Sequence, residues 1–159
     1  MLALVVVGGG AAFFLYRRMT GDNVDVSTWP QAPSDAVLRV AQAIAIAEGS
    51  PASWNNPGDL TGGDAYGFEL QRDGDGDALV NSAGVVRFVN LADGVNALYR
   101  KLQRIQNGAS RVYSSAMSLV DFAQEYTGGD NAGSWAKNVA AYLGLDVGSS
   151  VGDLFGGGQ

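Results

Sequence analysis

Apolar residues recur every three or four positions in four stretches between residues 34 and 145, and this period predicts four helices. We expect Ser34 to cap the first helix and Gly49 to end it. A second helix is expected over residues 91–105, ended by Gly108. The apolar stripes of these two helices consist of Val37, Val40, Ala41 and Ile44, and of Leu91, Val95, Leu98, Leu102 and Ile105.

The third and fourth predicted helices lie in the last third of the chain. Ser118 and Asp121 have the spacing of a capping box, so a helix is expected to begin there. Gly144 is placed to close the last helix. The apolar sides of these two helices are formed by Leu119, Phe122, Ala123 and Tyr126, and by Trp135, Val139, Tyr142 and Leu143.

Between the first and second predicted helices, turn-forming residues separate short apolar runs. Residues 55–58 and the Gly/Asp-rich residues 72–77 are turn sequences, and runs such as 83–90 predict a small β-hairpin. Residues 73–77 also match the first three ligands of a calcium loop, but Ala78 and Gly84 stand where that loop needs Gly and Glu, which favours a turn. The predicted fold class is therefore mainly α, in the α+β class.

Residues 1–16 carry no charged side chain and are followed at once by Arg17 and Arg18. A helix over residues 2–16 would span about 22 Å of a hydrocarbon core of ~30 Å, and the residues up to 19 extend it. We expect a single N-terminal transmembrane helix, with the following domain on the cytoplasmic side. A cleaved signal peptide is disfavoured because the basic pair follows the apolar run, and a buried soluble helix because residues 8–10 are glycines.

Composition divides the rest of the chain into three parts. Residues 20–33 are polar with two prolines and predict a linker between the anchor, residues 1–19, and the domain. Residues 34–145 form the predicted domain. The Gly-rich residues 146–159 are expected to be a tail that is mobile or docks on a neighbour.

Charge and residue types exclude several functions. The chain has 10 Lys and Arg against 16 Asp and Glu, a net charge of −6, so nucleic acid is not an expected partner. It has no Cys and no His, which excludes disulfides, Cys or His zinc sites and imidazole catalysis. Carboxylates must carry any proton transfer, and we expect no metal site and no cofactor.

Glu48 is the sharpest candidate for chemistry. It continues the apolar stripe of the first predicted helix, four residues after Ile44. Burial and the negative end of the helix macrodipole should raise the pKa of its carboxyl above ~4.3, which suits a general acid in glycosidic bond cleavage. The alternative is an exposed residue at the frayed end of the helix.

Four segments, taken in order, resemble the lysozyme-like superfamily. Residues 36–145 look most like phage virion-associated proteins and transglycosylase-like domains, which carry an Ala-rich helix ending in Glu-Gly followed by Asn-Asn-Pro-Gly-Asn-Leu. The resemblance implies a lysozyme-like domain in which Glu48 is the catalytic acid. The segments that carry it are AIAIAEGS at 43–50, NNPGDL at 55–60, GVVRFVNLADGVNALYRKL at 84–102 and SLVDFAQEYTGGDNAGSWAKNVAAYLGL at 118–145.

The same resemblance implies where the substrate binds. Asn55 and Asn56 match family positions that line the cleft, and Tyr126 matches the Tyr of the Phe-x-x-x-Tyr helix end. Asp59 stands where the family usually has Asn, so it is either a neutral change or a second carboxylate, with Asp64 a weaker candidate for that role. We expect core positions for the aromatic residues Phe68 and Trp135, whereas Tyr126 suits the core and sugar stacking equally.

The resemblance implies a peptidoglycan-cleaving glycosidase, a lytic transglycosylase that cuts the glycan strand between N-acetylmuramic acid and N-acetylglucosamine. One carboxylate suffices, because a hydroxyl of the substrate itself closes an anhydro ring. We expect a single-pass protein of a phage virion membrane or the host inner membrane, with other virion proteins as further partners. The alternative is a structural or glycan-binding virion protein without turnover.

Overall fold

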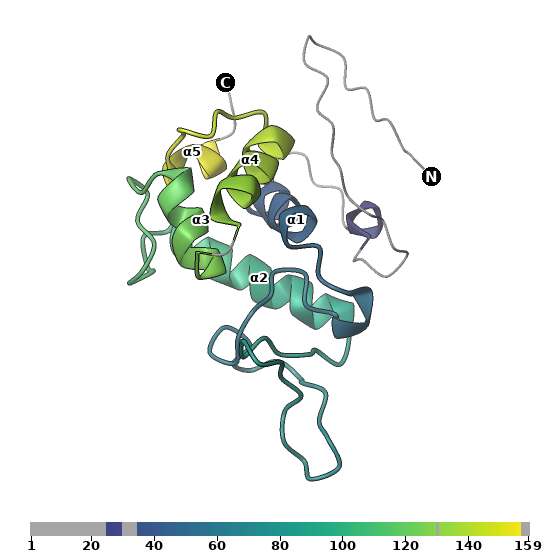
Figure 1. Ribbon diagram of the computed structural model, residues 1–159. Coiled ribbons are helices and arrows are strands. Elements are labelled where there is room, and N and C mark those ends of the chain that lie inside the picture. Colours follow the sequence, from purple (N-terminus) through teal and green to yellow (C-terminus); the bar gives the residue numbers. More distant parts are fainter. Residues whose placement is uncertain (1–24, 30–34, 130, 157–159) are drawn as a thin grey trace.

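The computed structural model describes residues 25–29, 35–129 and 131–156 of the chain. These residues form five α-helices and two short 3-10 turns, joined by loops (Figure 1). The helices are α1 (Ala36–Glu48), α2 (Leu91–Gln106), α3 (Leu119–Thr127), α4 (Ala132–Leu143) and α5 (Val151–Gly156); the 3-10 turns are η1 (Val26–Thr28) and η2 (Ala52–Trp54).

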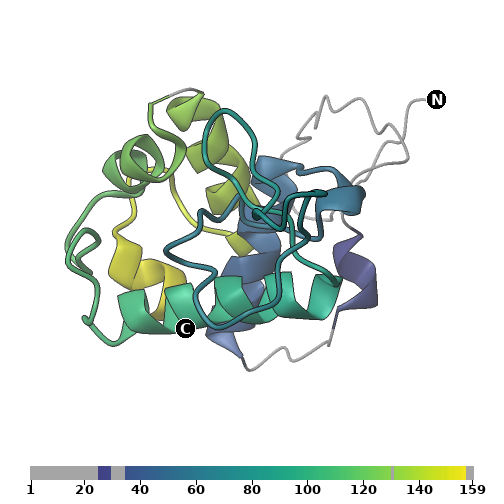
Figure 2. The ribbon, with the colours of Figure 1, turned by 90° about the horizontal axis from the view of Figure 1, so that it is seen from below.

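Helix α1 lies at the centre of the helical part of the molecule. Apolar residues occupy almost every side of it, from Val37 to Ala45, and a helix of this kind is stable only when it is covered all round. The helices α2, α4 and α5 and the turn η1 pack against α1, and α3 packs on α4. Figure 2 shows α2 running along one side of this group.

The ends of α1 are fixed by side-chain and backbone hydrogen bonds. Asp35, and not the predicted Ser34, caps the first turn: its Oδ1 accepts a hydrogen bond of 3.0 Å from the N–H of Leu38. Ser34 lies outside the described residues. At the other end Gly49 adopts a left-handed conformation, φ 61°, and its N–H donates to the carbonyl of Ala45. The helix therefore ends with Glu48, as predicted.

The other three predicted helices are confirmed. Helix α2 ends at Gln106 and is capped by Asn107, one residue before the predicted Gly108. Ser118 caps α3 and accepts a hydrogen bond from the N–H of Asp121, as the capping-box spacing indicates. Gly144 ends α4.

The predicted fold class is wrong, because the described residues contain no strand and no sheet. The segment predicted as a hairpin forms only isolated antiparallel bridges, Thr61–Val85, Leu70–Phe88, Arg72–Ala78 and Val80–Val86. The long loop between η2 and α2 extends from one end of the helical part (Figure 1).

Side-chain amides explain why the bridges do not join into a strand pair. The carbonyl of Val86 accepts a hydrogen bond from Asn56, and the carbonyl of Phe88 accepts from Asn55 and Gln71. Asn81 in turn accepts from two backbone N–H groups of its own turn, those of residues 83 and 85. Polar side chains thus satisfy backbone groups that a neighbouring strand would otherwise pair, which interrupts the ladder.

The predicted transmembrane helix lies in residues 1–19, outside the described residues. Within residues 25–29, 35–129 and 131–156, no helix has both the length and the apolar character that crossing a membrane requires.

Segments on both sides of the predicted domain also contribute to its core. Trp29, in the predicted linker, is buried beside α1 and belongs to the same apolar cluster. Val151 and Leu154 of α5, in the predicted Gly-rich tail, are buried in that cluster too. The folded unit therefore extends beyond residues 34–145 at either end.

Gly94 sets how closely α2 approaches the loop that precedes it. A Cβ atom at this position would lie 1.8 Å from the carbonyl oxygen of Asn55 and 3.0 Å from Cδ of Pro57. Such distances are far inside van der Waals contact, so only glycine permits this packing.

We therefore expect Gly94→Ala to lower the free energy of unfolding by ~2 kcal/mol or more, because α2 and the 55–58 turn must separate to admit the methyl group. Urea unfolding followed by circular dichroism measures this change. Gly133→Ala in α4 is the matched control: its added Cβ meets nothing within 4 Å, so the same substitution should stabilise by up to ~1 kcal/mol. Equal stability of Gly94→Ala and the parent would contradict the close packing.

Candidate carboxyl site and pocket

Glu48 lies at the end of α1, where α4 packs against that helix. Its Oε1 accepts a hydrogen bond of 2.8 Å from Nε1 of Trp135, a buried residue of α4. The carboxyl is partly exposed, so it is held by the core on one side and accessible on the other. Trp135 is a core residue, as predicted, and its indole N–H fixes the direction in which Glu48 points.

The pKa of Glu48 is raised from its ordinary value of 4.5 to about 7, and burial is the largest cause. The negative charge of Asp59 and a hydrogen bond between the two carboxyls also contribute to this rise, whereas the hydrogen bond from Trp135 and the charge of Lys101 act against it. The direction is the one expected from the position of Glu48 on the apolar stripe. A carboxyl with this pKa is protonated in an appreciable fraction of molecules at neutral pH, and it can donate or accept a proton there.

Asp59 is placed beside Glu48 by an unusual turn. Its backbone has φ 46°, in the left-handed region that Asn and Asp tolerate better than other side chains. Its Oδ1 accepts a 2.5 Å hydrogen bond from Oγ of Ser50, which is buried just after α1. Ser50 thus fixes the direction of the Asp59 carboxyl next to Glu48.

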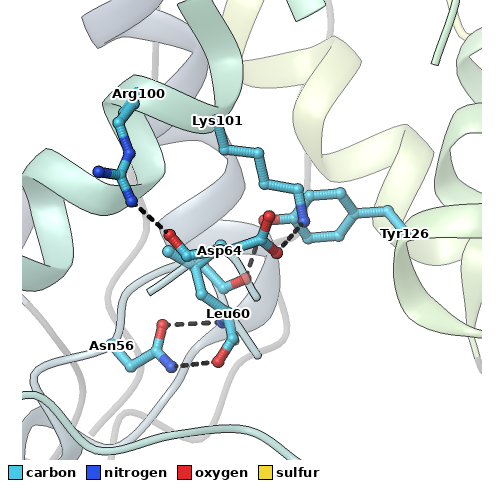
Figure 3. A network of polar contacts seen from close by, with 7 residues as sticks. Asn56, Leu60, Asp64, Arg100, Lys101 and Tyr126 are labelled. Atoms are coloured by element: carbon cyan, nitrogen blue, oxygen red, sulfur yellow. Dashed lines mark hydrogen bonds and ion pairs between the residues drawn. The ribbon is translucent and has the colours of Figure 1, made fainter. Parts of the chain in front are cut away.

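Asn56 holds the turn that carries Asp59. The side chain has no exposed surface (0 %). Its Nδ2 donates to the carbonyls of Leu60 and Val86 at 2.9 and 2.8 Å, and its Oδ1 accepts from the N–H of Leu60 at 2.9 Å. Figure 3 shows the amide facing the backbone of Leu60. The resemblance places Asn56 in the cleft, but the side chain offers no free polar atom to a ligand and acts on the site through the turn.

The side-chain amide of Asn55, like that of Asn56, is bound to backbone carbonyls. Its Nδ2 donates to the carbonyls of Phe88 and Val89 at 3.1 and 3.2 Å, and its backbone has φ 54°. The two adjacent amides thus anchor the turn to residues 86–89 from both sides. Both lie close to the carboxyl pair along the chain, and neither lines the pocket described below.

Tyr126 combines a place in the aromatic core with a place at the site. Its hydroxyl donates a 2.8 Å hydrogen bond to the carbonyl of Gly58, the residue before Asp59. Its ring packs in a cluster with Trp135, Phe122 and Tyr113, at centroid distances of 5.3, 5.5 and 6.3 Å. Nζ of Lys101 lies over this ring, 4.4 Å from its centroid (Figure 3). The ring is therefore packed in the core and also forms part of a pocket wall, and sugar stacking on it stays a prediction.

A pocket of about 430 Å³ opens next to the carboxyl pair. Asp59 and Tyr126 contribute to its wall, whereas Glu48 is not part of the lining. Lys101 and Asp64, which both belong to the lining, form an ion pair of 2.9 Å (Figure 3). The full lining comprises Asp59, Thr61, Asp64, Lys101, Arg104, Ile105, Ser110, Arg111, Val112, Tyr113, Glu125 and Tyr126.

Comparison of the chain with protein-family models, curated proteins and solved structures finds no match.

Three features of the site have weak or no signals in the sequence. Ser50 follows Glu48 by two residues, but nothing in that spacing indicates that it donates to Asp59. The hydrogen bond between Trp135 and Glu48 joins residues 87 positions apart. The basic side chains of the pocket come from the last turns of α2 and the loop after it, and their gathering depends on the path of that loop.

The Asp-rich residues 73–77 form a turn. Oδ1 of Asp73 accepts hydrogen bonds from the N–H groups of Asp75 and Asp77, at 3.0 and 2.9 Å. This is the turn alternative of the sequence analysis. In the described part of the chain, no group of three or more Asp, Glu, His or Cys side chains is arranged to hold a metal ion.

The titration of Glu48 can be followed at its partner. We expect the indole N–H signal of Trp135 in proton–nitrogen NMR spectra to shift with a midpoint near pH 7, because it donates to the carboxyl that ionises there. Glu48→Gln should remove this step, and Glu69→Gln, at an exposed loop position, should keep it. A midpoint near 4.5 would show that the carboxyl is not perturbed.

Stability should follow the same ionisation. The folded-state pKa of Glu48 lies above the ordinary value, so its contribution to stability is fully present below pH 4.5 and is lost as the pH rises through about 7. The free energy of unfolding of the parent, relative to Glu48→Gln, should therefore fall across this interval.

Proposed function

We propose that the protein cleaves the glycan strand of peptidoglycan as a lytic transglycosylase, with Glu48 as general acid and then general base. The observation that carries this proposal is the partly buried carboxyl of Glu48, with a pKa of about 7, held by Trp135 beside an open pocket. Glycosidic bond cleavage at neutral pH needs a carboxyl of this kind, protonated before the reaction and ionised after its first step.

The proton balance of this mechanism needs only one carboxyl. Protonated Glu48 donates to the glycosidic oxygen, and the bond from that oxygen to the anomeric carbon breaks. A hydroxyl of the same sugar then bonds to the anomeric carbon, and its proton returns to the Glu48 carboxylate. The products are a new chain end with a free hydroxyl and an anhydro sugar, and no water is consumed.

The position of Asp59 supports the transglycosylase over a paired-carboxylate hydrolase. Such hydrolases place the sugar between carboxyls that lie about 5–5.5 Å apart in retaining enzymes and ~6.5–9.5 Å apart in inverting ones. Asp59 instead accepts a hydrogen bond from Ser50 and acts on Glu48 through its charge, which supports a role beside the acid rather than across a substrate. In the proposed mechanism burial, together with the negative charge of Asp59, keeps Glu48 protonated.

A second candidate function is a glycan-binding or structural virion protein without turnover. The observation that favours it is that Glu48 lies outside the pocket lining, while the side chains of Asn55 and Asn56 are occupied by backbone groups. Under this alternative the pocket binds a saccharide and the carboxyl pair serves only the fold.

We further propose a phage origin and attachment to a membrane, as the sequence implies. The motif order over residues 36–145 supports membership of the lysozyme-like superfamily, near its phage virion-associated members. The apolar residues 1–16 with Arg17 and Arg18 support attachment to a virion membrane or the host inner membrane through residues 1–19. Other virion proteins would then be its neighbours.

Glu48→Gln should lower the rate of peptidoglycan cleavage by ~10²- to 10⁴-fold, because the amide cannot donate the proton. The substitution keeps an oxygen that accepts from Trp135, so the fold should survive. Release of soluble fragments from purified peptidoglycan measures the rate, with Glu69→Gln as a control at an exposed position. Cleavage at the parental rate by Glu48→Gln would reject Glu48 as the acid; a parent without activity would favour the binding alternative.

Asp59→Asn separates the two mechanisms within the same assay. Asn tolerates the left-handed backbone of residue 59 and still accepts from Ser50, so a single-carboxyl enzyme should retain activity and release anhydro products. As the pH is raised, the activity of this variant should decline at a lower pH than that of the parent. The reason is that the negative charge of Asp59, which contributes to the raised pKa of Glu48, is absent. Reducing-end products in mass spectra, together with an inactive Asp59→Asn, would identify a hydrolase.

Membrane attachment is tested by removing residues 1–19. The full-length chain should partition into detergent or lipid vesicles, whereas residues 20–159 should remain in the aqueous phase. The circular dichroism spectrum of the shortened chain should still show the helices of the folded domain. Full-length protein that stays in the aqueous phase would contradict attachment through these residues.

A further inference from the structure

Lys101 of α2 lies in the pocket wall close to the carboxyl pair. It lines the same pocket as Asp59 and Tyr126, and its Nζ lies over the ring of Tyr126. This ring packs in turn against the ring of Trp135, at a centroid distance of 5.3 Å, and Trp135 donates its hydrogen bond to Glu48. A series of direct contacts therefore joins the ammonium group on α2 to the carboxyl at the end of α1.

The ammonium group of Lys101 is held in this position from two sides. Its Nζ donates a 2.9 Å hydrogen bond to Oδ2 of Asp64, and the face of the Tyr126 ring attracts it as well. The neighbouring Arg100 donates to the backbone carbonyl of Asp64 at 3.0 Å, which ties the loop at Asp64 to α2 (Figure 3). Only 17 % of the Lys101 side chain is exposed, so water and salt screen its charge less than that of a surface lysine.

The surroundings of Glu48 oppose its ionised form. Burial does so most strongly, and the negative charge of Asp59 adds to the effect. Two contributions act in the opposite direction, the hydrogen bond from Trp135 and the positive charge of Lys101. Of these two, the charge of Lys101 is the one that reaches Glu48 from the pocket side, where the proton must leave.

The other groups around the site change this balance little. Burial is the largest cause that raises the pKa of Tyr113 to about 12 and the pKa of Tyr126 well above 10, so both hydroxyls are neutral near pH 7. Further charged side chains of the pocket lining are exposed, so water screens their effect on Glu48. They are Arg104, Arg111 and Glu125.

We propose that Lys101 is a positioning residue of the reaction: its ammonium group, held by Asp64 over Tyr126, stabilises the carboxylate that forms when Glu48 donates its proton. This inference rests on the proposed function, in which Glu48 gives a proton to the glycosidic oxygen and later takes one from a hydroxyl. Lys101 forms no bond in either step and keeps its own proton. Asp64 limits the effect, because pairing with a carboxylate offsets part of the charge of Lys101.

Two substitutions that remove opposite charges test the inference in the full-length chain, kept in detergent. The titration of Glu48 is followed at the indole N–H signal of Trp135. Lys101→Gln removes the positive charge, so the midpoint should rise by roughly half a pH unit or more. Asp64→Asn removes the negative charge but keeps an oxygen that accepts from Lys101, so the midpoint should fall by a similar amount.

Two further variants separate charge from damage to the fold. Lys101→Arg keeps the charge and should leave the midpoint close to the parental value of about 7. Lys137→Gln, at an exposed position of α4, removes one positive charge elsewhere and should also leave it unchanged. Loosened packing would let water reach Glu48 and move every midpoint toward 4.5, whichever charge was removed. An unchanged or lower midpoint in Lys101→Gln, or a rise in Lys101→Arg as large as in Lys101→Gln, would overturn the inference.

The pH dependence of peptidoglycan cleavage separates this inference from the proposed function. Because Glu48 must be protonated to donate, the rate should decline at a higher pH in Lys101→Gln, and at a lower pH in Asp64→Asn, than in the parent. The maximal rate of Lys101→Gln should fall roughly threefold or more, since a weaker acid donates its proton less readily. An active parent whose variants keep its pH profile and its maximal rate supports the enzyme and rejects the role of Lys101. Opposite NMR shifts together with a parent that lacks activity support the effect of Lys101 on Glu48 and reject the enzyme.

Discussion

The burial of α1 on every side is the constraint on which the rest of the structure depends. An apolar helix of this kind must be covered by other elements, and α2, α4, α5 and η1 supply that cover. The last residue of α1 therefore lies at a junction between α4 and the turn at 55–60. Glu48 is the consequence: a carboxyl that the helix carries into partly buried surroundings, where the indole of Trp135 meets it.

Two further contacts turn this junction into a site. Asp59 brings a second negative charge next to Glu48, which is unfavourable for two ionised carboxylates, so one of them retains its proton near neutral pH. The turn that carries Asp59 is fixed by the hydrogen bonds of Asn56 and by the hydroxyl of Tyr126 on Gly58. The close approach of α2 at Gly94 sets the other side of the same turn. Fold and chemistry thus share the same few residues, and the proposed acid works only while the turn holds.

The pocket beside the carboxyl pair has a lining of mixed charge although the chain as a whole is acidic. Lys101 neutralises Asp64, and Arg104 and Arg111 share the lining with Asp59 and Glu125. The groups within a few ångströms of a ligand decide what is bound, whereas overall charge acts over longer distances. The aromatic cluster around Tyr126 joins this wall to Trp135, the partner of Glu48.

The sequence by itself determined the helices and the candidate acid. The period of apolar residues and the capping residues predicted four helices, with Gly49 at the end of the first and Ser118 at the start of the third. These signals are visible in the sequence because they act within one or two helical turns. Glu48 was visible for the same local reason, its position on the apolar stripe. The hairpin was predicted wrongly because β-propensity does not reveal that the amides of Asn55 and Asn56 occupy the carbonyls of residues 86–89. The partners of Glu48, the role of Tyr126 and the gathering of Arg104 with Arg111 were decided only by tertiary structure, since each joins segments whose separation along the chain carries no periodic signal.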